Sequence, residues 1–222
     1  MRSLRILGFA TLALALPSPA VQENSAAIVK RGVEDSVAVE GLYKRGPIDQ
    51  AFSSAAADLS SSVNPKITVI QSSVATLKSS TDAQVTAQAV ATIRTNLQGI
   101  AVDLGRDGIV IVGAVSSLGR AVPALTQADI DNLTAALNSL TSTLTNIQAT
   151  LVLVQSVSAS TTAAVASNIF TVRLSATTIV NPVQILVPNI IASGTIKGLN
   201  VTNLTEAYRK FDVIGVELIS GL

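Results

Sequence analysis

Residues 126–155 read TQADIDNLTAALNSLTSTLTNIQATLVLVQ, the most regular pattern in the chain. Large apolar residues recur there at alternating steps of four and three, which places them on one stripe of an α-helix. The pattern holds for about 30 residues, or roughly 45 Å of helix. It predicts a long helix that packs against other helices. The residues of this seam are Leu133, Leu137, Leu140, Leu144, Ile147, Leu151 and Val154.

The opposite face of the predicted helix is polar but carries no charge. Between Asp131 and Lys197 the chain has a single charged residue, Arg173. A helix of a soluble protein normally presents charged side chains to water, so this surface is expected to be weakly hydrated. The composition therefore favours a protein that binds or adsorbs apolar material. The polar face contains Asn132, Ser139, Thr143, Asn146 and Thr150.

The N-terminus has the pattern of a secretory leader. Arg2 and Arg5 precede an apolar run from Ile6 to Leu16, and small residues lead to Ala20. An apolar run of this length is too short to cross a bilayer. We expect residues 1–20 to be a signal peptide that is cleaved after Ala20.

Two dibasic pairs follow the leader, Lys30-Arg31 and Lys44-Arg45. The second pair lies directly before the first helical pattern, where cleavage by a secretory convertase is expected. An exposed charged pair without processing is the alternative interpretation of each. We take residues 21–45 as a pro-segment and residues 46–222 as a mature chain long enough for one domain with a hydrophobic core.

The residue types that carry most enzymatic chemistry are missing. The chain has no Cys and no His, which removes the thiol nucleophile, the usual general base and the soft metal ligands. Two carboxylate pairs remain, Asp103 with Asp107 and Asp129 with Asp131, but a predicted helix end explains each. We expect no enzyme activity, no metal and no cofactor. A net charge of +1, with scattered charges, gives no reason to expect a nucleic-acid partner.

Helical spacing continues on both sides of the seam, with signals for breaks and caps. The run from Ile109 to Val115 fits a buried helix, and a strand is the alternative because periodicity does not separate the two. Two prolines in the later segment argue against an uninterrupted membrane helix. The expected breaks are Asn64-Pro65, where the bundle continues after a kink, Arg106-Asp107-Gly108, Pro182 and Pro188. The expected caps are Thr81 with Gln84, Thr126 with Asp129 and Asn203 with Glu206.

Together these patterns predict an all-α, single-domain bundle of five to seven helices with an aliphatic core. Such a core could separate around a slender apolar guest, and an ordinary bundle without a ligand is the alternative. Three N-x-S/T sequons, at Asn132, Asn200 and Asn203, are expected glycosylation sites in a secreted chain. A glycan on Asn203 conflicts with its expected role as a helix cap.

The order of parts resembles the fungal hydrophobic surface-binding protein A family, which includes cell-wall galactomannoproteins. The leader is followed by a pro-segment that ends in Leu42-Tyr43-Lys44-Arg45, and a helix begins at Pro47-Ile48-Asp49. Leu125-Thr126-Gln127-Ala128-Asp129 is similar to the family's entry to a long helix. The resemblance implies a secreted or wall-associated helical protein of a fungus. Members adsorb to hydrophobic surfaces, and some hold fatty acids or similar lipids between helices.

The predicted function is therefore a secreted, non-enzymatic protein that binds hydrophobic surfaces or fatty-acid-like lipids. The alternative is a structural cell-wall mannoprotein without a small-molecule ligand, associated with wall polysaccharide. No transmembrane segment is expected in the mature chain. Arg173 and Tyr208 are candidate anchors for a lipid carboxylate, although a solvated helix-face residue is the other interpretation of Arg173. The candidate lining residues are Leu137, Leu140, Leu144, Ile147, Leu151 and Phe211.

Overall fold

The computed structural model describes residues 48–117, 125–193, 196 and 198–221, which form five α-helices and no strand. The predicted all-α class and helix number are confirmed. All of these residues belong to one compact unit, Leu42–Leu222. The expected signal peptide, pro-segment and processing residues Ala20, Lys44 and Arg45 lie outside the described residues. The helices are α2 (Ile48–Ser79), α3 (Ala83–Ser117), α4 (Gln127–Gln155), α5 (Ala159–Ala192) and α6 (Thr202–Ile219).

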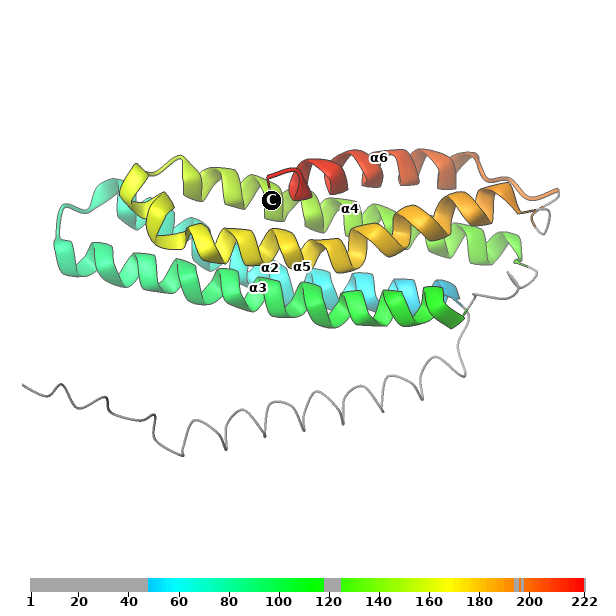
Figure 1. The fold of residues 1–222 in the computed structure, drawn as a ribbon, viewed down its shortest axis with the longest axis horizontal. Coiled ribbons are helices and arrows are strands. Elements are labelled where there is room, and N and C mark those ends of the chain that lie inside the picture. The colour runs from blue at the N-terminus through cyan, green and yellow to red at the C-terminus, as the bar shows by residue number, and fades with distance from the viewer. Residues whose placement is uncertain (1–47, 118–124, 194–195, 197, 222) are drawn as a thin grey trace, which may run out of the picture. The chain divides into compact units, whose positions relative to one another are not determined.

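The helices pack in a closed circuit whose order differs from the order in the sequence. α2 packs against α3 and α4, and α3 packs against α5 (Figure 1). The shorter α6 packs on both α4 and α5, which contact each other only weakly. Each helix therefore buries a stripe toward the centre and leaves its outer side without a neighbour among the described elements.

The core is aliphatic, as the sequence predicts. Every residue of the α4 seam is buried, and the two buried aromatic side chains of the described residues are Phe52 and Phe211. Full burial of a large aliphatic side chain is worth about 1.5–3 kcal/mol before the cost of ordering the chain. Packing of this kind accounts for a stable bundle without a disulfide.

Helix caps confirm one prediction and correct another. Thr126 N donates to Asp129 Oδ2 at 2.7 Å and Asp129 N donates to Thr126 Oγ1 at 3.3 Å, so the predicted capping box begins α4. The predicted cap at Thr81 is wrong, because Asp82 Oδ1 accepts the N–H of Gln84 at 2.8 Å. A carboxylate accepts hydrogen bonds without needing to orient a hydroxyl proton, so Asp82 serves this position well.

α6 begins one residue before the predicted cap. Asn200 Oδ1 accepts the N–H of Thr202 at 3.1 Å, and no side chain caps the helix at Val201. Asn203 therefore lies inside the first turn with its side chain exposed. The expected conflict between a cap and a glycan at this residue does not arise.

The predicted helix breaks are wrong, because the helices run through them. α2 contains Pro65, and α5 contains Pro182 and Pro188. Buried apolar residues flank each proline on both sides, and their packing outweighs a lost hydrogen bond of the helix. Beside Pro65, the Lys66 ammonium donates to the carbonyl of Ser62 at 2.9 Å.

α3 also continues past its predicted end. Gly108 lies inside α3. At this position α5 passes so close that a Cβ would overlap the side chain of Thr178, which explains why the residue is a glycine. The segment from Ile109 to Val115 is helical, as predicted. It is not wholly buried, however, since Ile109 and Val112 are exposed.

Candidate functional site

The predicted lining residues are part of the packed core. Leu137, Leu140, Leu144, Ile147, Leu151 and Phe211 are all fully buried. They line neither of the two surface hollows described next. In this closed form of the bundle, apolar material would reach them only after helices separate.

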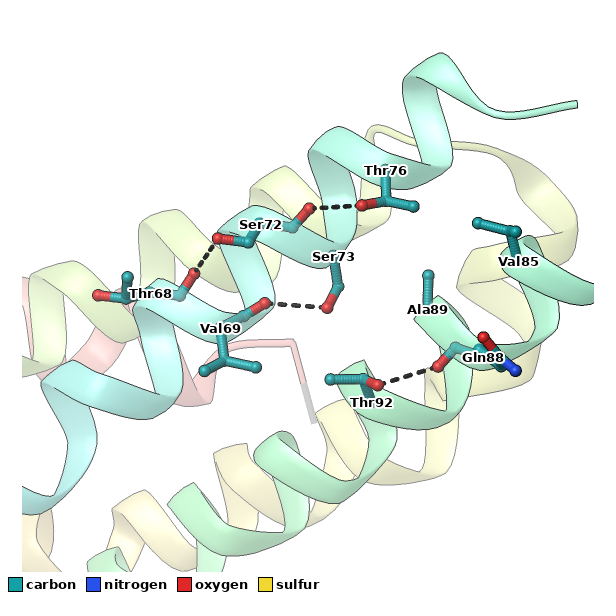
Figure 2. Close-up of a pocket in the computed structure, with 9 residues that line it drawn as sticks. All are labelled: Thr68, Val69, Ser72, Ser73, Thr76, Val85, Gln88, Ala89 and Thr92. Carbon is teal, nitrogen blue, oxygen red and sulfur yellow. Dashed lines mark hydrogen bonds between the residues drawn. The ribbon is translucent and has the colours of Figure 1, made fainter.

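The larger hollow is a groove of about 340 Å³ between the second half of α2 and the first half of α3 (Figure 2). Its volume is near the lower end of the range for small-molecule sites. None of its lining residues is charged. They are Thr68, Val69, Ser72, Ser73, Thr76, Val85, Gln88, Ala89 and Thr92.

The hydroxyl groups of this groove are already satisfied by the helices. Ser72, Ser73 and Thr76 each donate to the carbonyl four residues earlier, at 2.9–3.1 Å (Figure 2). Thr68 and Thr92 do the same. Because the hydroxyl protons are used in these bonds, the Ser and Thr side chains offer the groove only weak acceptor oxygens and, for Thr, methyl groups. The groove therefore offers little to hold a charged ligand.

The smaller hollow lies on α6 and is lined by Arg209, Lys210 and Val213. Tyr208 precedes Arg209 in the chain and is partly buried. Burial, and then the charge of Asp212, raise the pKa of the Tyr208 hydroxyl, which keeps it protonated at neutral pH. A protonated phenol can donate a hydrogen bond, but the hollow has no buried polar side chain that would select a ligand.

Arg173 has a partner inside the chain. Its Nη1 donates to the carbonyl of Gly221 at 2.7 Å, just beyond the C-terminal turn of α6, where a positive charge is favourable. Its buried Nε has no hydrogen-bond partner among the described residues. Tyr208 and Gly221 are 13 residues apart, or about 20 Å along a helix. One lipid carboxylate therefore does not contact both predicted anchors.

Two buried aspartates of α3 pair with cations that are partly exposed, and sequence reasoning missed these pairs. Lys66 Nζ lies 2.7 Å from Asp103 Oδ2, and Arg106 Nε lies 3.0 Å from Asp107 Oδ1. Both aspartates lie inside α3 and are buried, so their predicted explanation as helix-end residues is wrong. Burial raises the pKa of the Asp107 carboxyl, against the hydrogen bond from Arg106. The spacing of Asp103, Arg106 and Asp107 at i, i+3 and i+4 was the available signal.

These paired charges have the features of a structural link. Each carboxylate has a cation within hydrogen-bond reach, and the cluster contains no nucleophile or partly exposed base. Among the described residues there is no group of three or more Asp, Glu, His or Cys side chains that could hold a metal ion. The Lys66–Asp103 pair joins α2 to α3, whereas Arg106 and Asp107 pair within α3.

Exposed large hydrophobic residues are concentrated on the outer sides of α3 and α5. We call six of them the α3–α5 face. α5 has one charged residue in its 34 residues. By length and composition it is the one helix of the described chain that could span a membrane, a property shared by core helices of soluble proteins, and 44% of its apolar window is buried. The α3–α5 face consists of Val102, Ile109, Val112, Phe170, Leu174 and Ile185.

The three sequon asparagines have different surroundings. Asn132 Nδ2, the atom that would carry a glycan, donates to Asp49 Oδ2 at 2.9 Å. The backbone N–H of Asn200 donates to Gln127 Oε1 at 2.9 Å, which holds the start of α6 against the start of α4. Asn200 and Asn203 are exposed.

The chain matches no protein-family model, no curated protein and no solved structure. The resemblance to the fungal hydrophobic surface-binding family therefore stays a prediction.

Proposed function

We propose that this protein is a secreted, non-enzymatic protein that binds apolar surfaces or lipids. The observation that supports the proposal is the excess of apolar side chains on α3 and α5 beyond those that the core buries. Contiguous exposed apolar patches are uncommon on monomeric soluble proteins and mark interaction sites. The residues best suited to contact apolar material are therefore those already at the surface.

Charge and pocket chemistry support the same class of function. The groove between α2 and α3 has uncharged walls, and its hydroxyl protons are used within the helices. Strong attraction to polyanions requires clustered Lys and Arg, whereas the net charge here is +1. We also propose that the mature chain is not held in a membrane by α5, since the buried stripe of this helix packs against α3 and α6.

The test is retention of the purified, folded protein on an octyl resin, compared with a charged resin at the same ionic strength. Retention on the octyl resin only is the expected result. Native mass spectrometry of the secreted protein then distinguishes two modes of binding. A stoichiometric acyl-chain mass would place lipid inside the bundle, whereas a mass without ligand would favour adsorption from outside. Failure to bind either the resin or lipid would remove the proposal.

A wall glycoprotein without a ligand is the second candidate. The exposed side chains of Asn200 and Asn203 favour it, because both sequon asparagines are open to glycosylation. Intact mass before and after enzymatic removal of N-glycans checks this directly. Occupied sequons together with no retention on octyl resin would support this candidate over the first.

A further inference from the structure

We propose that cleavage after Arg45 gives Gly46 an α-ammonium group that forms an ion pair with the buried carboxylate of Asp49. This pair fixes the start of α2 beside the start of α4. The inference rests on the secretory processing that belongs to the proposed function, and not on the binding of apolar material. Gly46 precedes the described residues, and Asp49 lies in the first turn of α2.

Asp49 is a buried acid with one unpaired oxygen. The residue is 7% exposed, and its Oδ2 accepts a hydrogen bond from Nδ2 of Asn132 on α4 at 2.9 Å. Its Oδ1 is buried and has no hydrogen-bond partner among the described residues. A buried carboxylate oxygen without a donor costs free energy. An added donor is therefore most favourable at this atom.

The described chain offers no cation to Asp49. Its ion pairs join Lys66 and Arg106 to other aspartates, farther along α2 and α3. The first two turns of α2 and of α4 contain three acids and no Lys or Arg. A positive charge placed at this end of the two helices therefore meets charges of opposite sign. The three acids are Asp49, Asp129 and Asp131.

Cleavage changes what residue 46 can donate. Within the chain, the nitrogen of Gly46 is an uncharged amide with one N–H. Hydrolysis of the Arg45–Gly46 bond by a secretory convertase adds one water, which leaves a carboxylate on Arg45 and an ammonium on Gly46 near neutral pH. Hydrogen bonds between ionised partners are about twice as strong as those between neutral ones. The processed chain therefore has a much stronger donor for Asp49.

The spacing between Gly46 and Asp49 suits such a contact. α4 begins with the same interval, since Asp129 Oδ2 accepts from the backbone nitrogen of Thr126, three residues earlier, at 2.7 Å. Asp129 is the third residue of α4 and Asp49 the second of α2, so the contact to Gly46 lies just before the helix. Pro47 has no N–H and gives Asp49 no competing donor.

The carboxylate of Asp49 also offsets an unfavourable charge. The N-terminal end of a helix carries a partial positive charge, which disfavours an ammonium close to it. An ionised Asp49 makes the ammonium more stable, whereas a neutral side chain would leave it facing the end of α2 alone. The two cases have opposite effects on how tightly Gly46 holds its proton, so a measurement of this amine separates them.

The test measures how fast the new amine is acylated. The full chain is folded and treated with a protease specific for dibasic pairs, which cuts after Arg31 and Arg45. The digest then contains two N-terminal glycines, Gly46 on the bundle and Gly32 on the released peptide of residues 32–45. Limiting acetic anhydride at about pH 7.5 modifies only deprotonated α-amines, and mass spectrometry compares the two. Gly32 is the matched control.

We expect Gly46 to be acylated at least about threefold more slowly than Gly32, because the ion pair keeps its amine protonated. The difference should disappear or reverse in Asp49→Asn, and should persist in Asp131→Asn, which neutralises an exposed acid of α4. Circular dichroism checks that both variants fold. At about pH 10 the two glycines should react alike, because both amines are then largely deprotonated.

Equal acylation of the two glycines at about pH 7.5 overturns the inference. Slow acylation of Gly46 that persists in Asp49→Asn, or at about pH 10, also overturns it, because the amine would then be only covered. If Asp49→Asn does not fold, the comparison with Gly32 at the two pH values decides. A folded chain that is not cut after Arg45 overturns the inference as well. None of these outcomes depends on octyl resin, so a failure of apolar binding is recognised separately.

A second measurement tests whether the pair fixes the start of α2. The end of a helix opens locally with a much smaller free energy than the whole molecule, so the thermal midpoint is expected to change little. Hydrogen exchange at the amides of Phe52 and Ser53 should slow at least about twofold after cleavage of the unmodified chain, but not after cleavage of Asp49→Asn. Unchanged or faster exchange in the unmodified chain would show that the pair does not hold this turn.

Discussion

At the scale of single residues, the contact between α3 and α5 depends on a missing Cβ. A Cβ at Gly108 would lie 3.1 Å from the carbonyl carbon of Thr178 and would overlap its side chain. The same kind of approach occurs between α6 and α5, where a Cβ at Gly215 would lie 2.9 Å from Cγ1 of Val180. Glycine in a helix normally costs about 1 kcal/mol relative to alanine, so its presence here reflects close packing.

Gly108→Ala should destabilise the bundle by about 1–3 kcal/mol, because backbone of α5 has to move away from the added methyl group. The control is Gly105→Ala in the same helix, where nothing lies within 4 Å of the added Cβ. That change should stabilise the protein by about 0.5–1 kcal/mol. Urea unfolding of both variants measures the two effects. Equal stability of the variants would show that Gly108 is not a packing constraint.

Asp107 should make stability depend on pH. Burial raises its folded pKa above the unfolded one, so the folded chain keeps a proton that the unfolded chain has released. The resulting stabilisation is complete below the unfolded pKa and is lost as pH rises through the folded pKa. Asp107→Asn should therefore lose less stability than the unmodified chain between about pH 4 and about pH 7. Urea unfolding at both pH values checks this, and identical pH dependence of the two proteins would contradict it.

At the scale of elements, apolar spacing predicted the helices well and their ends poorly. The seam of α4 and its capping box follow from local sequence, because a cap and a stripe involve residues within a few turns. The helix ends predicted at Pro65 and Gly108 were wrong, because the contacts that keep the helices continuous there are made with residues distant in the sequence. Burial of Val63 and Ile67 against neighbouring helices holds α2 through its proline, and Thr178 explains the glycine of α3.

α6 should depend on Arg173 for the order of its last turn. Removing this side chain in Arg173→Ala takes a hydrogen bond and a favourable charge from the C-terminal end of the helix. We expect faster hydrogen exchange at the amides of Glu217 to Ser220, with little change in α4. Arg209→Ala is the control, because Arg209 is exposed on the outer side of the same helix. Similar exchange in both variants would mean that the Gly221 contact does not hold the turn.

At the scale of the whole molecule, the fold class could be predicted and the candidate surface could not. Which outer residues of α5 remain uncovered depends on the positions of α3 and α6, and these follow from contacts between distant segments. The sequence of α5 is apolar on several sides, so periodicity alone did not separate Ile185, which is exposed, from Leu186, which is buried. The predicted lining residues are buried in the core, which any bundle with a leucine seam would show.

The described bundle should fold without the preceding part of the chain. Its helices belong to the compact unit Leu42–Leu222. A protein of residues 46–222 should therefore unfold within about 2 °C of the full chain in a thermal scan, since one kcal/mol shifts the midpoint by only a few degrees at this size. A much lower midpoint would show that residues before Gly46 contribute to stability.

The partly buried Tyr208 has a consequence for spectroscopy. The chain has no tryptophan, and its other tyrosine, Tyr43, precedes residue 46. Emission from a protein of residues 46–222 excited at tyrosine absorption therefore comes from a single ring on α6. A change in that emission reports on the environment of α6 alone, while the aliphatic interior of the other four helices stays optically silent. The molecule thus contains its own label for the movement of one helix.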